Sequence, residues 1–370
     1  MIYFENHCKG VTGLNNHVVS YTLCTAISNF LGREFYFDYE LPTITLPEVS
    51  AEGPLKTQLA HVMNSRRSMV SELLDIPVSR VFDIDRGVRN KLRIDDPMLT
   101  FMTDRDQQEQ FGSTMIWNFF SLGREGLIRE QLNEYDLLEF GSNCIVNSSF
   151  FFFLPRLAKR ELLESVRIKY RPEFEDLAAR IVAALGGYNA IHLRLGDFQT
   201  VYGPDGFAVD VERFAEFLNA RFGDSELPLL VATDEFQRKD LFATILKGFR
   251  YDFVDELILR DFFDDFRRLP FSDFNVLSLI NQLICAGSER FAGTCRSTFT
   301  SVIHRIRQER YGKADFNFFP DARVRRHMNS TFELVPDSQG FFEWNRYSAF
   351  AEHYEYPAWM REWNYELTAV

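Results

Sequence analysis

The chain has 370 residues, of which 46% are hydrophobic and 15% aromatic, and 38 are phenylalanine. This length and composition indicate a folded protein with a large core and room for two domains. The formal net charge of −12 excludes general binding of nucleic acid or of an acidic membrane, so an anionic ligand would need a local cationic site.

The chain begins with MIYFEN, which predicts a short strand, followed by the Gly/Asn-rich loop HCKGVTGLNN. These residues lack the basic and apolar segments of a signal peptide, so we expect a cytoplasmic protein. The five cysteines form no Cys-x-x-Cys pair, and neither a disulfide framework nor a zinc-finger spacing follows from them. The longest apolar run, Phe150–Pro155, is too short to span a bilayer.

An apolar stripe at spacings of four, four and three predicts a helix over Val18–Leu31. Asn15 and Asn16 stand where its N-cap would lie, and Gly32 stands where its C-cap would lie. The next segment, EFYFDY, predicts a strand, which gives a βαβ unit whose first loop faces the carboxyl ends of the strands. From Pro42 to Asn147 the sequence predicts no clear order of elements.

From Pro172 onward, predicted helices and strands alternate. The helices are EFEDLAARIVAALGG, DVERFAEFLNARFG, FQRKDLFATILKGF, NVLSLINQLICAG and VIHRIRQERYG, and the strands are YNAIHLRL, LPLLVATD, YDFVDELIL and RFAGTC. This alternation predicts an α/β fold with parallel strands and helices on both faces. We expect two Rossmann-like domains facing each other across a cleft, residues 1–187 and 188–319. The Trp- and Tyr-rich tail, 320–370, should pack back onto the first.

The stretch AIHLRLGDF predicts a strand with two different faces. In an extended chain its Ile and Leu side chains point one way, whereas His192 and Arg194 point the other. The second face brings an imidazole and a guanidinium to the carboxyl end of the strand, where Gly196 opens a loop. Ligands of open parallel sheets bind at that end. A solvated edge strand with two polar positions is the plainer alternative.

The later stretch CRSTFTS opens the last predicted helix. Free N–H groups and the helix dipole make such a start an anion site, although at a random helix start plain N-capping by Ser or Thr is the more common explanation. With Arg194, whose planar fork matches a phosphate, a diphosphate pocket is plausible. We expect three loops to converge: Gly13–His17, His192–Asp197 and Cys295–Thr300. The chain has no Walker motif or Gly-x-Gly-x-x-Gly motif, so NTPase and nicotinamide-dehydrogenase functions lack support.

In that order, AIHLRLGDF, VATDE and LINQLICAGSERFAGTCRSTFTSVIHRIR resemble the GDP-fucose protein O-fucosyltransferase family. The early TGLNNH is similar to that family's Gly-rich Asn loop. The resemblance covers Pro172–Arg307 and Gly10–Glu40 and is weak between them. The α1,2- and α1,6-fucosyltransferases share the His-x-Arg strand and the Gly-Asn loop, so the subfamily stays open.

The resemblance implies a GT-B fold and an inverting transfer from a nucleotide sugar, with GDP-fucose as donor and no metal or cofactor. By position, Arg194 would bind the β-phosphate and stabilise the leaving diphosphate, and His192 would contact the nucleotide. A structural His, a core Phe and capping Asn residues are the plainer readings. The other implied donor-binding residues are Ser297, Thr298 and Phe299 at the phosphate and ribose, and Asn15 or Asn16 from the other domain.

Two positions depart from the family pattern. Thr12 stands where some members carry a Glu base, so the proton acceptor would be the leaving phosphate or Asp197, which could instead cap the turn. Asn281 stands where the family usually places an Asp near the base pocket. Because Asn offers a single carbonyl oxygen to guanine, the preference for GDP is open.

Two other classes of function are compatible with these motifs: a catalytically idle protein that binds a nucleotide sugar or glycan, and a structural scaffold. The presence of Arg194 counts against an idle binding protein, because such a protein has no need to stabilise a leaving group. The acceptor is a hydroxyl on a cytosolic peptide, a glycan or a small molecule, and neither nucleic acid nor a membrane is an expected partner.

Overall fold

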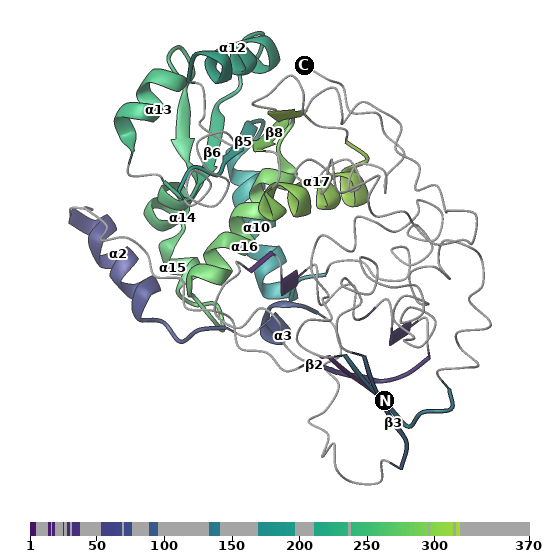
Figure 1. Cartoon of the computed structure of the whole chain (residues 1–370). Coiled ribbons are helices and arrows are strands. Elements are labelled where there is room, and N and C mark those ends of the chain that lie inside the picture. Colours follow the sequence, from purple (N-terminus) through teal and green to yellow (C-terminus); the bar gives the residue numbers. More distant parts are fainter. Residues whose placement is uncertain are drawn as a thin grey trace, which may run out of the picture. The chain divides into compact units, whose positions relative to one another are not determined.

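The structure is a computed structural model, and the chain is traced in Figure 1. It divides into two compact units, the first being Met1–Thr43, Met69–Lys169 and Ser330–Tyr365, and the second Ile44–Ser68, Tyr170–Asn329 and Glu366–Val370. The residues that the structure describes are 1–4, 14–15, 17–18, 25, 28–29, 32–37, 53–68, 70–75, 89–94, 133–140, 169–196, 211–235, 238–294, 297–313 and 316–318.

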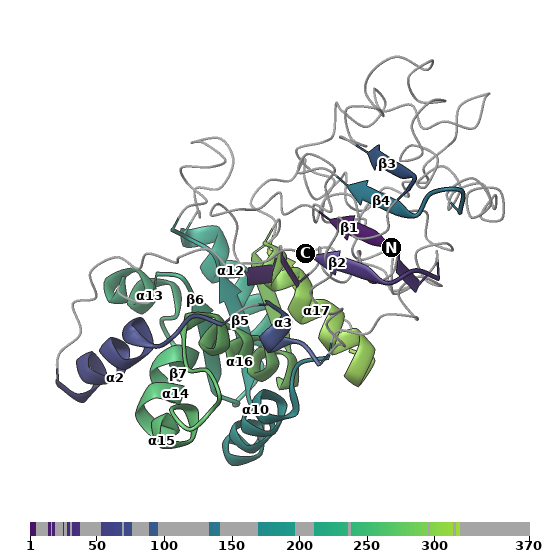
Figure 2. The same cartoon turned by 90° about the horizontal axis from the view of Figure 1, so that it is seen from below.

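The first unit contains a parallel sheet. Its strands follow the order β2-β1-β4-β3 (Figure 2), and every neighbouring pair is parallel. The bounds are Ile2–Phe4 for β1, Phe35–Phe37 for β2, Lys91–Ile94 for β3 and Leu137–Phe140 for β4, with a short helix α3 at Val70–Leu73. The parallel pairing of β1 with β2 confirms the predicted βαβ connection.

Gly32 ends the helical segment between β1 and β2, as the sequence predicts. Its φ is +64°, a left-handed value that costs glycine little. The Gly32 N–H donates to the Asn29 carbonyl at 3.2 Å, and the Arg33 N–H donates to the Ser28 carbonyl at 3.1 Å. These two bonds form a Schellman motif, which satisfies the last carbonyls of the helix.

The second unit contains a parallel sheet with the order β7-β6-β5-β8-β9. Its strands are Asn189–Leu193 (β5), Leu229–Thr233 (β6), Tyr251–Phe253 (β7), Phe291–Thr294 (β8) and Phe316–Phe318 (β9). Its helices are Gly53–Asn64 (α2), Pro172–Leu185 (α10), Val211–Phe222 (α12), Lys239–Ile245 (α13), Val254–Asp261 (α14), Phe263–Phe266 (α15), Phe274–Gly287 (α16) and Thr298–Tyr311 (α17).

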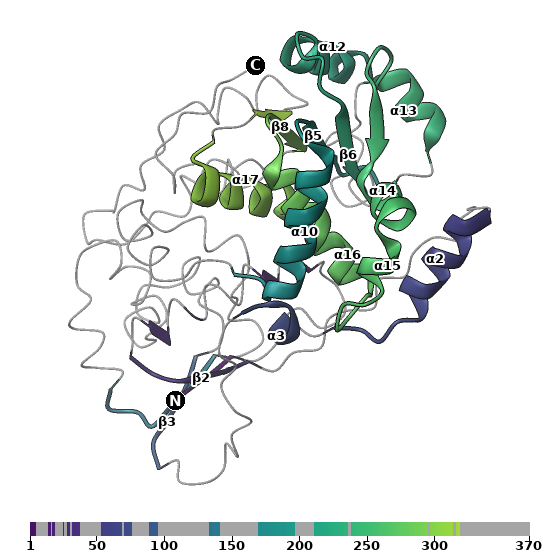
Figure 3. The same cartoon turned by 180° about the vertical axis from the view of Figure 1, so that it is seen from behind.

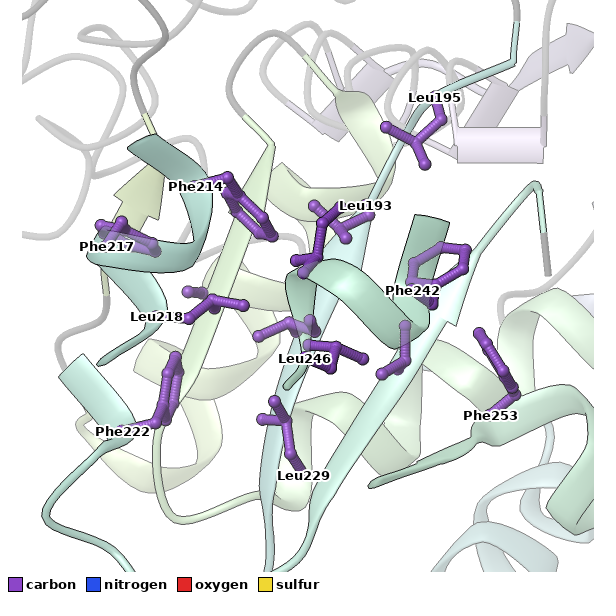
Figure 4. Close-up of a cluster of buried hydrophobic side chains, with 14 residues drawn as sticks. Leu193, Leu195, Phe214, Phe217, Leu218, Phe222, Leu229, Phe242, Leu246 and Phe253 are labelled. Atoms are coloured by element: carbon purple, nitrogen blue, oxygen red, sulfur yellow. The ribbon is translucent and has the colours of Figure 1, made fainter. Parts of the chain in front are cut away.

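One face of this sheet is covered by α12 and α13. Leu193 and Leu195 point toward Phe214 and Phe242 of these helices (Figure 4), within a cluster of 14 buried hydrophobic side chains. The Ile and Leu positions of β5 therefore lie in the core, as their alternation predicts. Each large apolar side chain buried here stabilises the fold by about 1.5–3 kcal/mol.

Helices α10, α16 and α17 form the layer on the other face (Figure 3). The first turn of α10 begins at Pro172 and carries two acidic residues, which suits a helix N-terminus. Asp273 caps α16, and its carboxylate accepts from the Val276 N–H at 3.0 Å. At the other end of α16, the fully buried Arg307 donates to the carbonyls of Ala286 at 2.8 Å and Ser288 at 2.7 Å. A cation thus satisfies the C-terminal carbonyls of α16.

One element differs from the sequence prediction. The predicted strand YDFVDELIL is wrong after Phe253, because α14 begins at Val254. Val254, Leu257 and Ile258 are buried at helical spacing, and acidic residues occupy the first turn. Helix α10 belongs to the second compact unit, and the domain boundary after residue 187 stays a prediction.

Some predictions lie outside the described residues, including the placement of the tail 320–370. How the two units face each other, and hence the GT-B arrangement, stays a prediction. The fold that the structure shows is α/β, with a parallel sheet in each unit. In the described part of the chain, no helix is long and apolar enough to cross a membrane.

Candidate functional site

A cluster of polar side chains lies at the carboxyl ends of β5 and β8, where α17 begins. His192 of β5 is buried, and its Nδ1 lies 2.7 Å from the Thr300 hydroxyl oxygen of α17. Its ring stacks on Phe299, with the ring centroids 4.4 Å apart and the planes inclined by 25°. The predicted strand and helix-start motifs therefore meet in space, which confirms that these two of the three loops converge.

His192 is a neutral imidazole in this setting. Burial, and to a smaller extent the nearby Arg194 cation, lower its pKa to about 3. A neutral ring offers one donor and one acceptor but no charge. The positive charge at this end of β5 therefore comes from Arg194.

Gly293 of β8 allows α17 to approach the sheet closely. A Cβ on Gly293 would lie 2.3 Å from Cγ2 and 2.6 Å from Oγ1 of Thr300. Both distances are shorter than any ordinary contact, so a side chain here would push the start of α17 away from His192. Glycine at this position thus holds the strand end and the helix start together.

Thr294 joins the ends of β5 and β8. Its hydroxyl donates to the His192 carbonyl at 3.2 Å and accepts from the Arg194 N–H at 3.1 Å. Both bonds fix the backbone from which the Arg194 side chain extends. No role for Thr294 was predicted, although its position at the end of a predicted strand marks it as part of this edge.

Arg194 is partly exposed and lies beside Asp234, which follows β6. The Arg194 Nε lies 3.0 Å from the Asp234 Oδ2, and the two side chains are 32% and 29% exposed. Because β5 and β6 are parallel neighbours, their carboxyl ends bring these residues together. The VATDE stretch contains this aspartate, but its partner could not be read from the sequence.

The start of α17 supports the predicted anion site and also its plainer alternative. The buried Ser297 hydroxyl accepts from the Thr300 N–H at 3.5 Å, which is the geometry of an N-cap. Thr298 and Phe299 are half-buried in the first turn. Their binding to a donor stays a prediction.

The remaining predicted site residues are not in this cluster as described. Asn15 is buried within the first unit, and its approach to a donor stays a prediction. Asn16 and Asp197 lie outside the described residues.

Asn281 of α16 is buried, and its amide donates to the Asp255 carboxylate of α14 at 2.7 Å. Its Oδ1 is also buried and has no hydrogen-bond partner in the described structure. Burial raises the pKa of Asp255 to about 6, although the bond from Asn281 acts in the opposite direction. Asn281 thus belongs to a buried polar pair, and its reading of a nucleobase stays a prediction.

Within the described ranges, no group of three or more His, Cys, Asp or Glu side chains is placed to hold a metal ion. At the carboxyl edge, Arg194 and Asp234 form an ion pair, and the Glu235 carboxylate lies over the turn that follows. What this edge can do chemically is bind an anion through the Arg194 guanidinium.

Solved structures similar to this chain share little sequence with it. POFUT1 in complex with GDP has a TM-score of 0.49 and 14% identity, over 86% of this chain and 98% of that one. A mutant of Arabidopsis thaliana FUT1 in complex with GDP has a TM-score of 0.45 and 12% identity, over 87% of this chain and 71% of that one. POFUT1 in complex with GDP-fucose has a TM-score of 0.46 and 14% identity, over 83% of this chain and 94% of that one. No family model and no curated protein matches the chain.

Proposed function

We propose that the protein is an inverting, metal-independent glycosyltransferase that transfers a sugar, fucose from GDP-fucose, to a hydroxyl acceptor. The observation that carries the proposal is Arg194, which follows β5 and whose backbone N–H donates to the Thr294 hydroxyl at the carboxyl end of β8. The motif resemblance along Pro172–Arg307 supplies the donor. The cleft and the acceptor side are expected from the same resemblance.

In the proposed reaction, the acceptor oxygen forms a bond to the anomeric carbon of the sugar from the face opposite the diphosphate. The bond between that carbon and the β-phosphate oxygen breaks, and its electron pair stays on the diphosphate. The acceptor proton passes to Asp197 or to an oxygen of the leaving phosphate. Attack from the opposite face inverts the anomeric configuration.

Arg194 would stabilise the negative charge that develops on the leaving diphosphate. Its planar fork can donate two parallel hydrogen bonds to phosphate oxygens, and the N-terminus of α17 adds a partial positive charge. A preorganised donor of this kind contributes on the order of 10²–10³ in rate. The neutral His192 stacked on Phe299 would give the nucleotide an apolar wall without competing for its charge.

The test is a panel of nucleotide sugars with purified protein, read by thermal shift and by slow hydrolysis to free nucleoside diphosphate. We expect GDP-fucose to raise the melting temperature and to be hydrolysed, and Arg194→Ala to abolish the hydrolysis. A thermal shift without hydrolysis would favour a catalytically idle binding protein. If no nucleotide sugar gives either signal, the glycosyltransferase proposal is wrong.

A further inference from the structure

The turn that follows β5 is held by a carboxylate from the neighbouring strand. In the parallel pair of β5 and β6, Leu193 is in register with Thr233, so the residues after each of them leave the sheet side by side. Asp234 is therefore the first residue after β6, just as Arg194 is the first residue after β5, and both lie at the same edge of the sheet. Within the second unit this puts an acidic side chain next to the proposed diphosphate-binding arginine.

Asp234 accepts two hydrogen bonds from this turn and forms an ion pair with it. Its Oδ1 accepts from the Leu195 N–H at 2.9 Å, and its Oδ2 accepts from the Gly196 N–H at 3.2 Å. The Nε of Arg194 lies 3.0 Å from Oδ2. One carboxylate thus fixes both the backbone after Arg194 and the guanidinium itself.

Gly196 shows that the carboxylate lies directly over the turn. A Cβ at this position would lie 3.0 Å from the Asp234 Oδ2 and 3.0 Å from the Glu235 Oε1. That separation is tighter than nearly all real Cβ contacts, so a side chain would displace the carboxylate. The Gly-Asp step after the His-x-Arg strand therefore leaves room for Asp234 to reach the backbone.

We propose that Asp234 is a positioning residue for Arg194 in sugar transfer, an inference that rests on the proposed function. A guanidinium has five N–H donors, and phosphate is best bound by a pair of parallel donors in its plane. Because the Asp234 carboxylate lies 3.0 Å from the Arg194 Nε and is itself held by the backbone of the turn, it restrains the orientation of the guanidinium. Asp234 acts through Arg194 and does not touch the donor.

The opposite role would also follow from an ion pair, since a carboxylate can compete with a phosphate for the same arginine. The two roles predict opposite results for Asp234→Asn, which removes the charge and keeps one acceptor oxygen. If Asp234 positions Arg194, its loss should slow the transfer. If Asp234 competes with the phosphate, its loss should make the diphosphate bind more tightly.

The experiment measures kcat and KM for hydrolysis of GDP-fucose by the full chain, in a cycle of Asp234→Asn, Arg194→Ala and the double variant. We expect Asp234→Asn to lower kcat about ten- to a hundredfold and to change KM less than threefold, as for a loss of preorganisation. In the Arg194→Ala background, the same substitution should have almost no further effect, because the group that it positions is gone.

Asp224→Asn is the matched control, since Asp224 pairs with Arg290 at the other end of the sheet. This control should leave kcat unchanged. Asp234→Glu, which retains the charge, should recover part of the lost kcat. If thermal unfolding shows that Asp234→Asn is not folded, Asp234→Glu replaces it in the cycle.

Three results would overturn the inference: an equal loss of kcat from Asp224→Asn, an undiminished effect of Asp234→Asn without Arg194, or tighter GDP binding by Asp234→Asn. If Arg194→Ala itself retains full activity, the assignment of Arg194 fails instead. If the wild-type chain hydrolyses no nucleotide sugar, titration of GDP by calorimetry replaces kinetics. The positioning role is then supported if Arg194→Ala binds GDP more weakly than the wild type, and if the double variant binds GDP as strongly as Arg194→Ala alone.

Discussion

The sheet of the second unit has an arginine–aspartate pair at each end, and the two pairs are built differently. At the amino end, Arg290 Nη1 and Nη2 donate to the two carboxylate oxygens of Asp224 at 2.5 and 3.0 Å. Arg290 Nη1 also donates to the Arg221 carbonyl at 2.8 Å. At the carboxyl end, Asp234 forms an ion pair with the Nε of Arg194 and accepts from two backbone N–H groups.

The same two residue types therefore serve different purposes. Asp224 occupies the forked edge of Arg290, which is the edge that a phosphate would need, so this exposed pair can only support the surface. Such pairs contribute about 0–1 kcal/mol. Asp234 contacts Arg194 at Nε, whereas Asp224 contacts both terminal nitrogens of Arg290. The geometry of the pair, more than its composition, separates a surface ion pair from a candidate site.

The largest expected effect comes from replacing each arginine by lysine. Arg194→Lys keeps the charge but loses the bidentate fork, so we expect kcat for GDP-fucose hydrolysis to fall on the order of 10²–10³. Arg290→Lys is the matched control at the amino end and should leave kcat within about twofold. Near wild-type turnover by a folded Arg194→Lys variant would contradict the role of Arg194.

Glycine substitutions compare the packing of the two ends. Gly293→Ala should destabilise the fold by about 1–3 kcal/mol and lower activity, because its Cβ would overlap Thr300 of α17. Gly187, before β5, is the control: its Cβ would meet the exposed end of the Leu227 side chain at 3.0 Å, which can move. Gly187→Ala should cost less than about 1 kcal/mol. Equal losses of unfolding free energy for Gly293→Ala and Gly187→Ala, measured by urea unfolding, would show that the carboxyl end is not more tightly packed than the amino end.

At the carboxyl end of the second sheet, the sequence predicts the features that depend on a local pattern of residues. Alternation along β5 predicts that His192 and Arg194 lie on the face opposite the Ile and Leu side chains, and the Ser/Thr-rich start of α17 predicts a helix N-terminus. Their contact requires the β5–β8 pairing, which no local pattern contains. The predicted strand after Phe253 failed because a short apolar run fits both a strand and the buried face of a helix.

The long-range partners could not be predicted for a similar reason. Asp234 meets Arg194 because β6 is the neighbour of β5, and Asp255 meets Asn281 because α14 packs against α16. Each pair is far apart in the chain, and polar side chains at such positions are usually solvated. Gly32, by contrast, was predicted because a helix end needs only its own neighbours.

Opposite pKa shifts of two aspartates also separate the ends of the sheet. Hydrogen bonds from Arg290 lower the pKa of Asp224, whereas burial after β7 raises the pKa of Asp255 from 3.8 to about 6. A raised pKa in the folded state means that the stabilising contribution is present below pH 3.8 and is lost as the pH rises through about 6.

Asp255→Asn should therefore gain stability relative to the wild type between pH 4 and pH 7, by about 1–2 kcal/mol after allowance for partial exposure. The Asn281 amide can still donate to the new side chain. Urea unfolding of both proteins across this range measures the difference. A constant difference in stability at all pH values would show that the Asp255 carboxyl is not buried in its charged form.

The smallest expected effect is that of a chelator, which we expect to leave hydrolysis of GDP-fucose unchanged. The proposed mechanism neutralises the diphosphate with Arg194 and the N-terminus of α17, so it needs no divalent ion. The measurement compares kcat with and without excess EDTA and then adds magnesium or manganese. Loss of activity that a metal restores would contradict the metal-independent mechanism.

Such a result would also assign a different role to Asp234, because its carboxylate could then bind a cation that in turn binds the diphosphate. Asp234→Asn separates the two cases. A metal ligand at this position predicts that the variant requires more metal for half-maximal activity, whereas a positioning residue predicts that added metal changes nothing.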